Sequence, residues 1–396
     1  MHAVSSLAGF DKEMAVLKRV SDTIFYRGHS DINYVMQPAI TRKNILPMER
    51  GNMLKEIISR NPVITLSRVL GMLFIVTCHI IKYYTFIPMH ESLGQFFNCG
   101  VDLFLFISGY LYGGKVVNRF GKWYFKRYLT VSLPAVIISI IVIVALFIVG
   151  EGVSVNSIIA YCLDLEGILF LNWNLTFLFR EILSLGSLWF TTIIMICYLL
   201  VPALQIFTRK IKASFRFIIL FSVLGAVISI SISSVVSVFT LLVFAIGYFC
   251  GKINLLEKTN NTFFIIYTGL FLAAIIGRLI LQKMSDGTFI YSSYVSVSHF
   301  VVGTWFIVAF AFIKNKNSSV ITKMADSRII RTLDGYSYYV FLVHGVFCMG
   351  FFNLYEKLPL PLATVLFVLA TVLSAVILKL ISQAISRPLL KMISKK

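Results

Sequence analysis

The strongest constraint on how this chain folds is a series of ten apolar segments, each about long enough to cross a lipid bilayer. They lie at residues 62–82, 93–112, 129–149, 188–207, 217–232, 234–250, 262–281, 293–313, 332–353 and 361–385. A helix of about 20 apolar residues spans the hydrocarbon core of a membrane. The composition agrees, because 58% of the residues are hydrophobic, 13% are charged and the mean hydropathy is +0.87. The sequence therefore predicts an all-α, polytopic integral membrane protein with about ten transmembrane helices.

The positive charges between these segments predict how the protein is oriented. With the N-terminus placed inside, twenty Lys and Arg residues follow the first segment on the inner side, whereas the outer loops hold three, Arg180, Lys283 and Lys357. Cytoplasmic loops are enriched in Lys and Arg. We therefore expect both termini to be cytoplasmic. The same enrichment accounts for the net charge of +19 without nucleic acid as a partner.

Two regions stand outside the series of spanning segments. Residues 154–178 are fairly apolar but contain Asp164 and Glu166, so we expect an interfacial or re-entrant element on the outer side. If this segment crossed the membrane, every later helix would be inverted. The Lys-rich and Arg-rich loops would then lie outside, which the charge pattern argues against. Residues 1–60 are polar, and FYRGHSDINYVMQPAITRKN (25–44) resembles the start of the small soluble FRG domain. Only half of such a domain fits before the transmembrane domain at 61–390, so we expect poor order; an ordinary cytoplasmic tail is the alternative.

Two ionisable side chains, Arg68 and His79, interrupt the first apolar segment. Eleven residues separate them, which is nearly three helical turns, so both project from one face about 16 Å apart along the axis. Charged groups at membrane depth are costly and normally face a protein interior or a wet cavity. The two residues are therefore candidates for a functional site. The alternative is a snorkelling Arg and a hydrogen-bonded structural His.

The second segment, FFNCGVDLFLFISGYLYGG, carries Asp102 near its middle and Ser108 toward the inner face. An unpaired carboxylate is expensive at that depth, so we expect Asp102 to have a partner on the first helix, either His79 or Arg68. The connection at residues 83–92 is short, which predicts that the two helices are antiparallel neighbours.

The inner loop that follows combines basic and aromatic residues. Five basic side chains lie there together with the aromatic Trp123; they are Lys115, Arg119, Lys122, Lys126 and Arg127. Positive-inside topology with an aromatic belt explains this pattern. The functional alternative is a site for an anionic, ring-bearing ligand from the cytosol.

Several enzyme classes are excluded because their motifs are absent. The sequence has no P-loop, GxGxxG, HExxH or GxSxG motif. Its six cysteines show no CxxC spacing, so neither a disulfide framework nor a metal site is predicted.

Five motifs in register resemble the membrane-bound acyltransferase family 3. They are Arg68-x10-His79, GVDLFLFISGYL (100–111), FKRYLTVSLP (125–134), SLWFTTIIMICYLLVPAL (187–204) and YSYYVFLVHGVF (336–347). The resemblance covers about residues 60–390. It implies a ten-helix enzyme, without a permanently bound cofactor, that moves an acyl group, usually acetyl from cytosolic acetyl-CoA, to a carbohydrate hydroxyl. The implied acceptor is an envelope glycan such as O-antigen, an exopolysaccharide or a lipid-linked glycan, at the bacterial inner membrane.

The resemblance also assigns roles to residues. It implies His79 as the catalytic histidine, with Arg68 and Asp102 as its partners. The loop implied to bind acetyl-CoA contributes Lys122, Trp123, Lys126 and Arg127. Substrate-binding or structural polar roles fall to Ser108, Trp189, Ser337, Tyr338 and His344. The chain departs from the family pattern at two places: Thr130 and Val131 stand where a third basic residue often occurs, and Ile194 and Met195 replace an acidic pair.

Two functions remain open from the sequence. In the first, neutral His79, supported by Asp102, accepts the proton of the attacking hydroxyl or carries the acetyl group transiently. In the second, the protein is a secondary transporter or flippase, and Arg68, His79, Asp102 and His344 form a proton relay. His299, in the eighth segment, matches no motif and is interpreted as structural.

Overall fold

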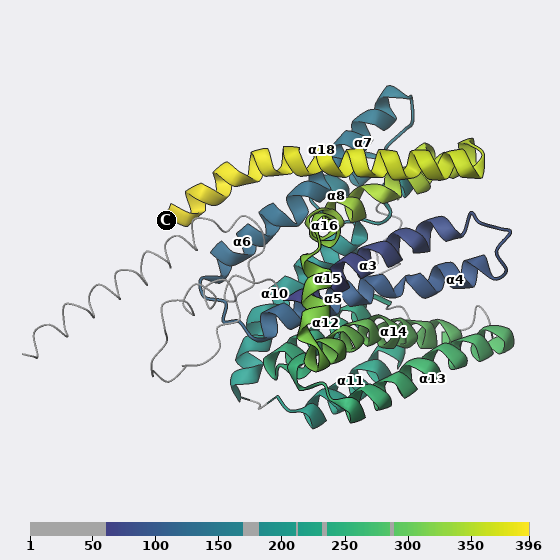
Figure 1. Ribbon diagram of the computed structural model, residues 1–396. Helices are drawn as coiled ribbons and strands as arrows, with labels where there is room; N and C mark the ends of the chain where they lie inside the picture. The colour runs from purple at the N-terminus through teal and green to yellow at the C-terminus, as the bar shows by residue number, and fades with distance from the viewer. Residues whose placement is uncertain (1–60, 169–181, 211–212, 232–235, 286–288, 396) are drawn as a thin grey trace, which may run out of the picture. The chain divides into compact units, whose positions relative to one another are not determined.

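The computed structural model describes residues 61–168, 182–210, 213–231, 236–285 and 289–395, and the regular elements within these ranges are helices (Figure 1). Residues 1–60, with the predicted FRG-like stretch, lie outside the described ranges. The helices are α3 (Pro62–Ile81), α4 (His90–Phe97), α5 (Cys99–Gly113), α6 (Phe120–Thr130), α7 (Ser132–Ile148), α8 (Val155–Cys162), α10 (Trp189–Lys210), α11 (Phe215–Ser231), α12 (Val236–Lys252), α13 (Asn261–Ser285), α14 (Phe289–Lys316), α15 (Ser318–Asp326), α16 (Arg328–Cys348), α17 (Leu354–Lys357) and α18 (Leu360–Lys395). Short 3₁₀ turns lie at η2 (Leu183–Leu185), η3 (Leu255–Lys258) and η4 (Gly350–Phe352).

The all-helical prediction is confirmed, and each of the ten predicted segments contains helix. Among the described residues, seven helical stretches are long and apolar enough to span a membrane. These are Pro62–Ile81, His90–Gly113, Phe120–Ile148, Trp189–Arg209, Asn261–Met284, Ser293–Lys316 and Leu360–Ile393. Phe215–Val227 and Phe239–Lys252 are apolar but shorter. The chain is thus an all-α protein with helices suited to a membrane, and ten crossings with cytoplasmic termini stay a prediction.

Helices α3 and α5 pack directly against each other, as the short connection predicts. Gly71 of α3 faces Leu103 and Phe104, and Gly100 of α5 faces the backbone of Gly71 and the side chain of Ile75. Later residues of α3 therefore contact earlier residues of α5: Ile75 lies at Gly100, whereas Gly71 also lies at Leu103 and Phe104. This is the order of contacts between antiparallel helices. Glycines at these points let the two backbones approach closely.

Helices α5 and α12 approach each other even more closely, along a seam of four glycines. A methyl group on Gly109 would collide with the carbonyl oxygen of Phe244, and one on Gly247 with that of Phe106. The seam continues at Gly113 and Gly251, each four residues further along its helix. This small-xxx-small spacing on both helices is typical of tight packing in membranes, where close van der Waals contact replaces the hydrophobic effect.

Helices α3 and α16 run parallel, and this direction bears on the path of the chain. Arg68 contacts Asp334, the His79 ring lies beside His344, and the Tyr83 hydroxyl donates to the Cys348 carbonyl at 2.7 Å. Both helices therefore advance in the same sense. The predicted ten-helix order requires this, because one additional crossing between them would have made α16 antiparallel to α3.

The break between α6 and α7 has a local cause. Pro134, in the first turn of α7, has no N–H, and its ring excludes the carbonyl of Thr130 four residues earlier. The helix accordingly stops at Thr130 and restarts at Ser132. The hydroxyl of Tyr338, on α16, donates to the carbonyl oxygen of Val131 at 2.6 Å. This bond ties the junction to α16.

The segment that follows α7 turns back into the protein. After α8, Asp164 adopts a left-handed backbone conformation (φ 56°), and its side chain accepts a hydrogen bond from Thr191 at 2.5 Å. Asp164 and Glu166 are 6% and 3% exposed. The two acidic side chains of this segment are thus buried in the protein, and its interfacial or re-entrant placement in the membrane stays a prediction. Residues 169–178 of the predicted segment lie outside the described ranges.

Candidate functional site

Two histidines from distant parts of the chain meet between α3 and α16. The ring centroids of His79 and His344 are 5.1 Å apart. His344 is completely buried, and its Nδ1 lies 2.6 Å from the carbonyl oxygen of Phe341, one turn earlier on the same helix. A carbonyl accepts, so Nδ1 carries the proton, and Nε2 then has a lone pair. No hydrogen-bond partner contacts that buried Nε2 within the described part of the chain. The arrangement provides a base beside His79.

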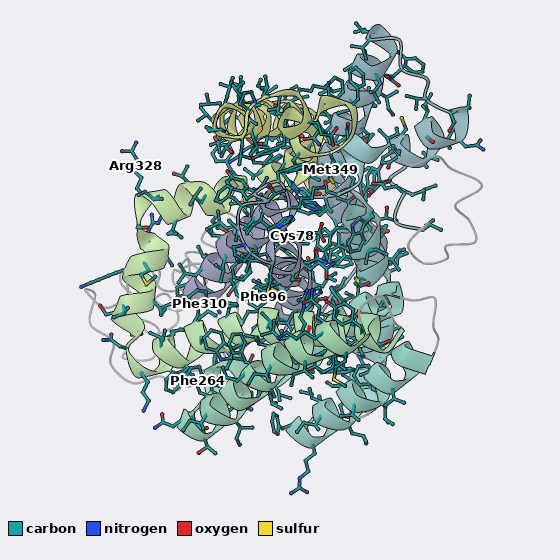
Figure 2. All side chains as sticks on the ribbon, turned by 90° about the vertical axis from the view of Figure 1, so that its right-hand side faces the viewer. Cys78, Phe96, Phe264, Phe310, Arg328 and Met349 are labelled. Atoms are coloured by element: carbon teal, nitrogen blue, oxygen red, sulfur yellow. The ribbon has the colours of Figure 1, made fainter. Side chains whose placement is uncertain are left out.

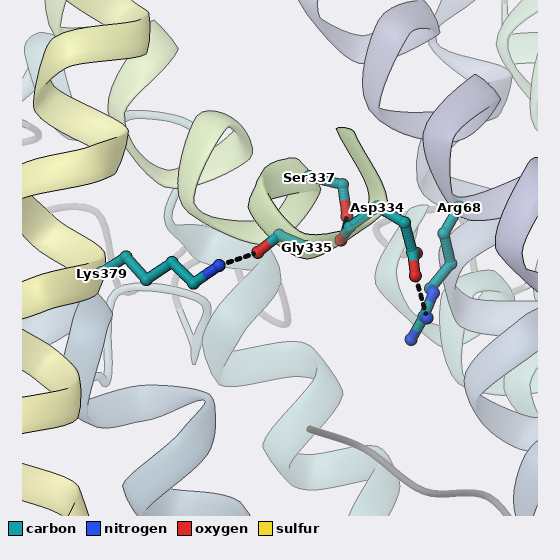
Figure 3. Close-up of polar contacts among 5 residues, drawn as sticks. All are labelled: Arg68, Asp334, Gly335, Ser337 and Lys379. Atoms are coloured by element: carbon teal, nitrogen blue, oxygen red, sulfur yellow. Dashed lines mark hydrogen bonds and ion pairs between the residues drawn. The ribbon is translucent and has the colours of Figure 1, made fainter. Parts of the chain in front are cut away.

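The same two helices hold an ion pair nearer their N-terminal ends. Arg68 donates from Nη2 to Oδ2 of Asp334 at 2.9 Å, and the Asp334 side chain is only 1% exposed (Figure 3). Sequence reasoning did not single out Asp334. One signal could have found it: ten residues separate Asp334 from His344, which nearly matches the eleven between Arg68 and His79, as packed parallel helices require.

Asp334 stands in a short polar stretch that also includes Ser337. The Ser337 hydroxyl donates to the backbone oxygen of Asp334 at 3.0 Å, and Lys379 of α18 donates to the carbonyl of Gly335 at 2.8 Å (Figure 3). In this structure, then, Ser337 hydrogen-bonds its own helix and does not contact the histidine pair. The late motif contributes Tyr338 to the α6–α7 junction and His344 to the histidine pair.

The partner expected for Asp102 has to be corrected. Asp102 is buried, in the first turn of α5, and no hydrogen bond or ion pair among the described residues joins it to Arg68 or His79. The physical reason is that Arg68 already has a carboxylate on α16.

Most of the basic segment forms helix α6. This helix is the first half of the α6–α7 stretch and lies at the opposite end from the C-terminus of α7. Its aromatic residues pack inward: Trp123 lies edge-on to Tyr112 at 5.1 Å and to Tyr198 at 5.7 Å between ring centroids. The Arg127 guanidinium lies over the Tyr112 ring at 5.5 Å. Lys122 and Lys126 are partly exposed. The two lysines of α6 are therefore accessible at its surface, while the side of the helix that carries Trp123 packs against the neighbouring helices.

Ser108 and Trp189 lie on α5 and α10, helices other than the two that carry the histidine pair. Ser108 is half-buried on α5, and Trp189 begins α10, with its ring centroid 6.4 Å from that of Phe190. Phe190 packs in turn against Phe341 at 5.2 Å, one turn before His344. The tryptophan motif thus helps to position α16 near the histidine pair.

A pair of buried carboxyl groups, Asp164 and Glu166, was noted in the sequence without a role. The Thr192 hydroxyl donates to the backbone oxygen of Asp164 at 2.8 Å, and the N–H of Gly167 donates to that hydroxyl at 3.1 Å. Burial raises the pKa of Asp164 to about 6 and that of Glu166 well above its usual value. The segment is thereby fixed to the first turn of α10, just after the tryptophan motif.

Comparison with known proteins identifies the family of the chain. A family model described as an acyltransferase domain (Acyl_transf_3) matches residues 61–380, so the chain belongs to the acyltransferase family 3. The protein is therefore a membrane acyltransferase, and of the two functions left open by the sequence the enzyme is the one supported. No curated protein and no solved structure matches the chain.

Proposed function

We propose that the protein moves an acetyl group from cytosolic acetyl-CoA to a hydroxyl of an envelope carbohydrate at the bacterial inner membrane. The observation that carries this proposal is the contact between His79 and His344, two imidazoles 5.1 Å apart that lie on the same two helices as the Arg68–Asp334 pair. Ionisable groups inside a membrane protein are costly and are normally retained for function. O-antigen, an exopolysaccharide and a lipid-linked glycan are the acceptor classes that the proposal covers.

The donor end of the site is the basic helix α6. Acetyl-CoA carries phosphates and an adenine ring, and Lys122, Lys126 and Arg127 supply charge-assisted hydrogen bonds to such phosphates. Arg127 already stacks on Tyr112, which holds its guanidinium in place. The bound thioester would then extend along the bundle toward His79, past Arg68. Trp123 anchors α6 to the neighbouring helices through its ring contacts with Tyr112 of α5 and Tyr198 of α10.

The chemistry is an acyl transfer in which His79 handles one proton. The acceptor hydroxyl oxygen attacks the thioester carbonyl carbon, the imidazole takes the hydroxyl proton, and the carbon–sulfur bond breaks. The imidazolium returns the proton to the departing thiolate, so free CoA and the acetyl ester are the products. Transient acetylation of His79 is the alternative route to the same products. The His344 ring, whose centroid lies 5.1 Å from that of His79, packs beside the reacting imidazole and orients it.

Replacement of His79 tests this proposal. His79→Ala should lower transfer of label from radiolabelled acetyl-CoA to membrane glycan by about 10² to 10⁴. The same membranes should contain the variant at the wild-type level by immunoblot. His299→Ala is the matched control, because His299 is also buried in a helix but contacts Arg278 and not the histidine pair. If His79→Ala transfers label at the wild-type rate, the proposal fails.

A further inference from the structure

One pocket lies at the end of the protein opposite the basic helix α6. It has a volume of about 150 Å³ and is lined by the last turn of α7, the loop after it, the start of α8, and residues of η2 and η4. Glu151, at its wall, follows the Phe120–Ile148 helical stretch, which begins with α6. At 1.5 Å per residue, such a stretch separates its two ends by roughly 40 Å. In the predicted orientation the pocket opens on the outer side.

Two glycines in the left-handed conformation shape the walls of this pocket. Gly150 (φ 82°) ends α7, and the Glu151 N–H donates back to the carbonyl of Leu146 at 2.9 Å. Gly350 (φ 65°) follows α16, and both Gly350 and Phe351 line the pocket. Glycine is the residue that tolerates this conformation, and the Gly150 turn is a fixed helix cap. The walls are thus defined by helix ends and not by loose loops.

The chemistry of the lining favours a ligand rich in hydroxyl groups. The polar lining consists of the carboxylate of Glu151 and the hydroxyls of Ser154, Ser157 and Ser184. The Ser184 hydroxyl donates a hydrogen bond to the carbonyl oxygen of Met349 at 3.1 Å, so the Ser184 oxygen can still accept one. The Ser154 and Ser157 hydroxyls hydrogen-bond each other at 2.6 Å, and the Lys357 ammonium lies 4.2 Å from the centroid of the Phe351 ring. The carboxylate of Glu151 and the oxygen of Ser184 accept hydrogen bonds beside this aromatic ring, which suits a sugar, because its hydroxyls donate and its ring carbons pack on aromatic rings.

A line of side chains leads from the pocket toward the histidine pair. Ser184, in the pocket, bonds to Met349, the residue after the end of α16 (labelled in Figure 2). Three residues on, the hydroxyl oxygen of Ser187 lies 2.8 Å from where a side chain on Gly345 would begin. His344 is the next residue, about 7 Å along the helix from Met349. Within the described residues, Ser187 Oγ and His344 Nε2 are both buried without a hydrogen-bond partner.

From these observations we infer that this pocket is the acceptor subsite, which binds one sugar residue of the glycan at the end of α16 that leads, beside Ser187, to the His344–His79 pair. This inference rests on the proposed function and specifies where the acceptor enters. Ser187, whose buried hydroxyl lies beside Gly345, is then the polar group between the pocket and His344. The rest of the glycan stays in solvent, since the pocket is open on its outer side.

A reversible block of the pocket tests the inference. Glu151→Cys would be placed in the full chain, and right-side-out membrane vesicles loaded with radiolabelled acetyl-CoA would be treated with MTSET, a cationic, membrane-impermeant thiol reagent. Transfer to the endogenous membrane glycan should fall by about tenfold or more and return on reduction with dithiothreitol, while KM for acetyl-CoA stays constant. Each sample is its own folding control, because the unmodified variant gives the reference rate.

Glu91→Cys is the matched control, since Glu91 is an exposed acid on α4 that does not line the pocket. The parent chain measures any effect of the native cysteines. If modified Glu151→Cys transfers label as fast as the reduced form, with labelling verified by mass, the inference is overturned. If the parent chain transfers no acetyl group at all, the proposed function fails instead, so the two failures are distinguishable.

Discussion

The Arg68–Asp334 pair is a contact at which a single substitution should lower the stability of the protein measurably. Asp334→Asn leaves a partly buried guanidinium without its carboxylate. Removing one partner of a buried pair costs about 3–5 kcal/mol, and we expect the low end because Arg68 is 23% exposed. Thermal inactivation of the detergent-solubilised protein measures the loss, as a fall in the apparent Tm relative to the parent chain.

The chain contains a matched control for this substitution close by. Arg331 and Asp326 form an ion pair at 2.8 Å, but their side chains are 60% and 56% exposed. Exposed pairs contribute about 1 kcal/mol or less. Asp326→Asn should therefore leave the apparent Tm nearly unchanged. Equal losses for the two substitutions would contradict the importance of burial at Asp334.

His344 permits a sharper test, because its two ring nitrogens have different roles. His344→Asn retains an N–H that can donate to the carbonyl of Phe341, as Nδ1 does at 2.6 Å, but lacks a basic atom in place of Nε2. If Nε2 assists the proton transfer, the variant should fold normally and lose about 10²-fold in transfer rate. Acetyl transfer and the melting temperature should be measured on the same preparation. A variant with normal activity would show that His344 is only a packed, hydrogen-bonded residue.

At the scale of elements, the glycine seam between α5 and α12 makes a prediction about packing. Gly109→Ala and Gly247→Ala would each place a methyl group against a carbonyl oxygen of the facing helix. Overpacking of this kind costs about 1–3 kcal/mol. Gly269→Ala, on α13, is the control, because nothing lies within 4 Å of the added methyl group. There alanine should raise stability by up to about 1 kcal/mol through its higher helix propensity.

The sequence predicts elements better than it predicts their breaks and partners. Apolar runs identified the ten helical segments because burial in lipid requires them to be long and apolar. The segment at 93–112 nevertheless contains the end of α4 and all but the last residue of α5, which meet at Asn98, and the length rule carries no signal for that break. Pro134 could have marked the break between α6 and α7.

The site shows the same limit, since its residues are far apart in the chain. Arg68 and His79 could be placed on one face because the helical repeat determines their spacing. The pairing of Arg68 with Asp334, 266 residues later, depends on which helices pack together, and no local pattern contains that information. The expected partnership of Arg68 or His79 with Asp102 relied on adjacency in sequence, and α16 provides the partner of Arg68 instead.

At the scale of the whole molecule, the orientation itself is testable. Asn118→Cys and Glu151→Cys lie in exposed positions on either side of the α6–α7 stretch. With the basic loop inside, an impermeant maleimide should label Glu151→Cys in intact cells but Asn118→Cys only after permeabilisation. The parent chain corrects for its native cysteines. The opposite labelling pattern would reverse the predicted topology.

The parallel contact between α3 and α16 has a consequence for biosynthesis. His79 enters the membrane early in translation, together with the basic helix that is proposed to hold the donor, yet the imidazole and the carboxylate that complete its surroundings come from a helix made near the end of synthesis. If α6 holds the donor as proposed, a chain that ends before α16 would contain the donor-binding helix and His79 but neither Asp334 nor His344, so the centre would be complete only when nearly the whole chain has been made.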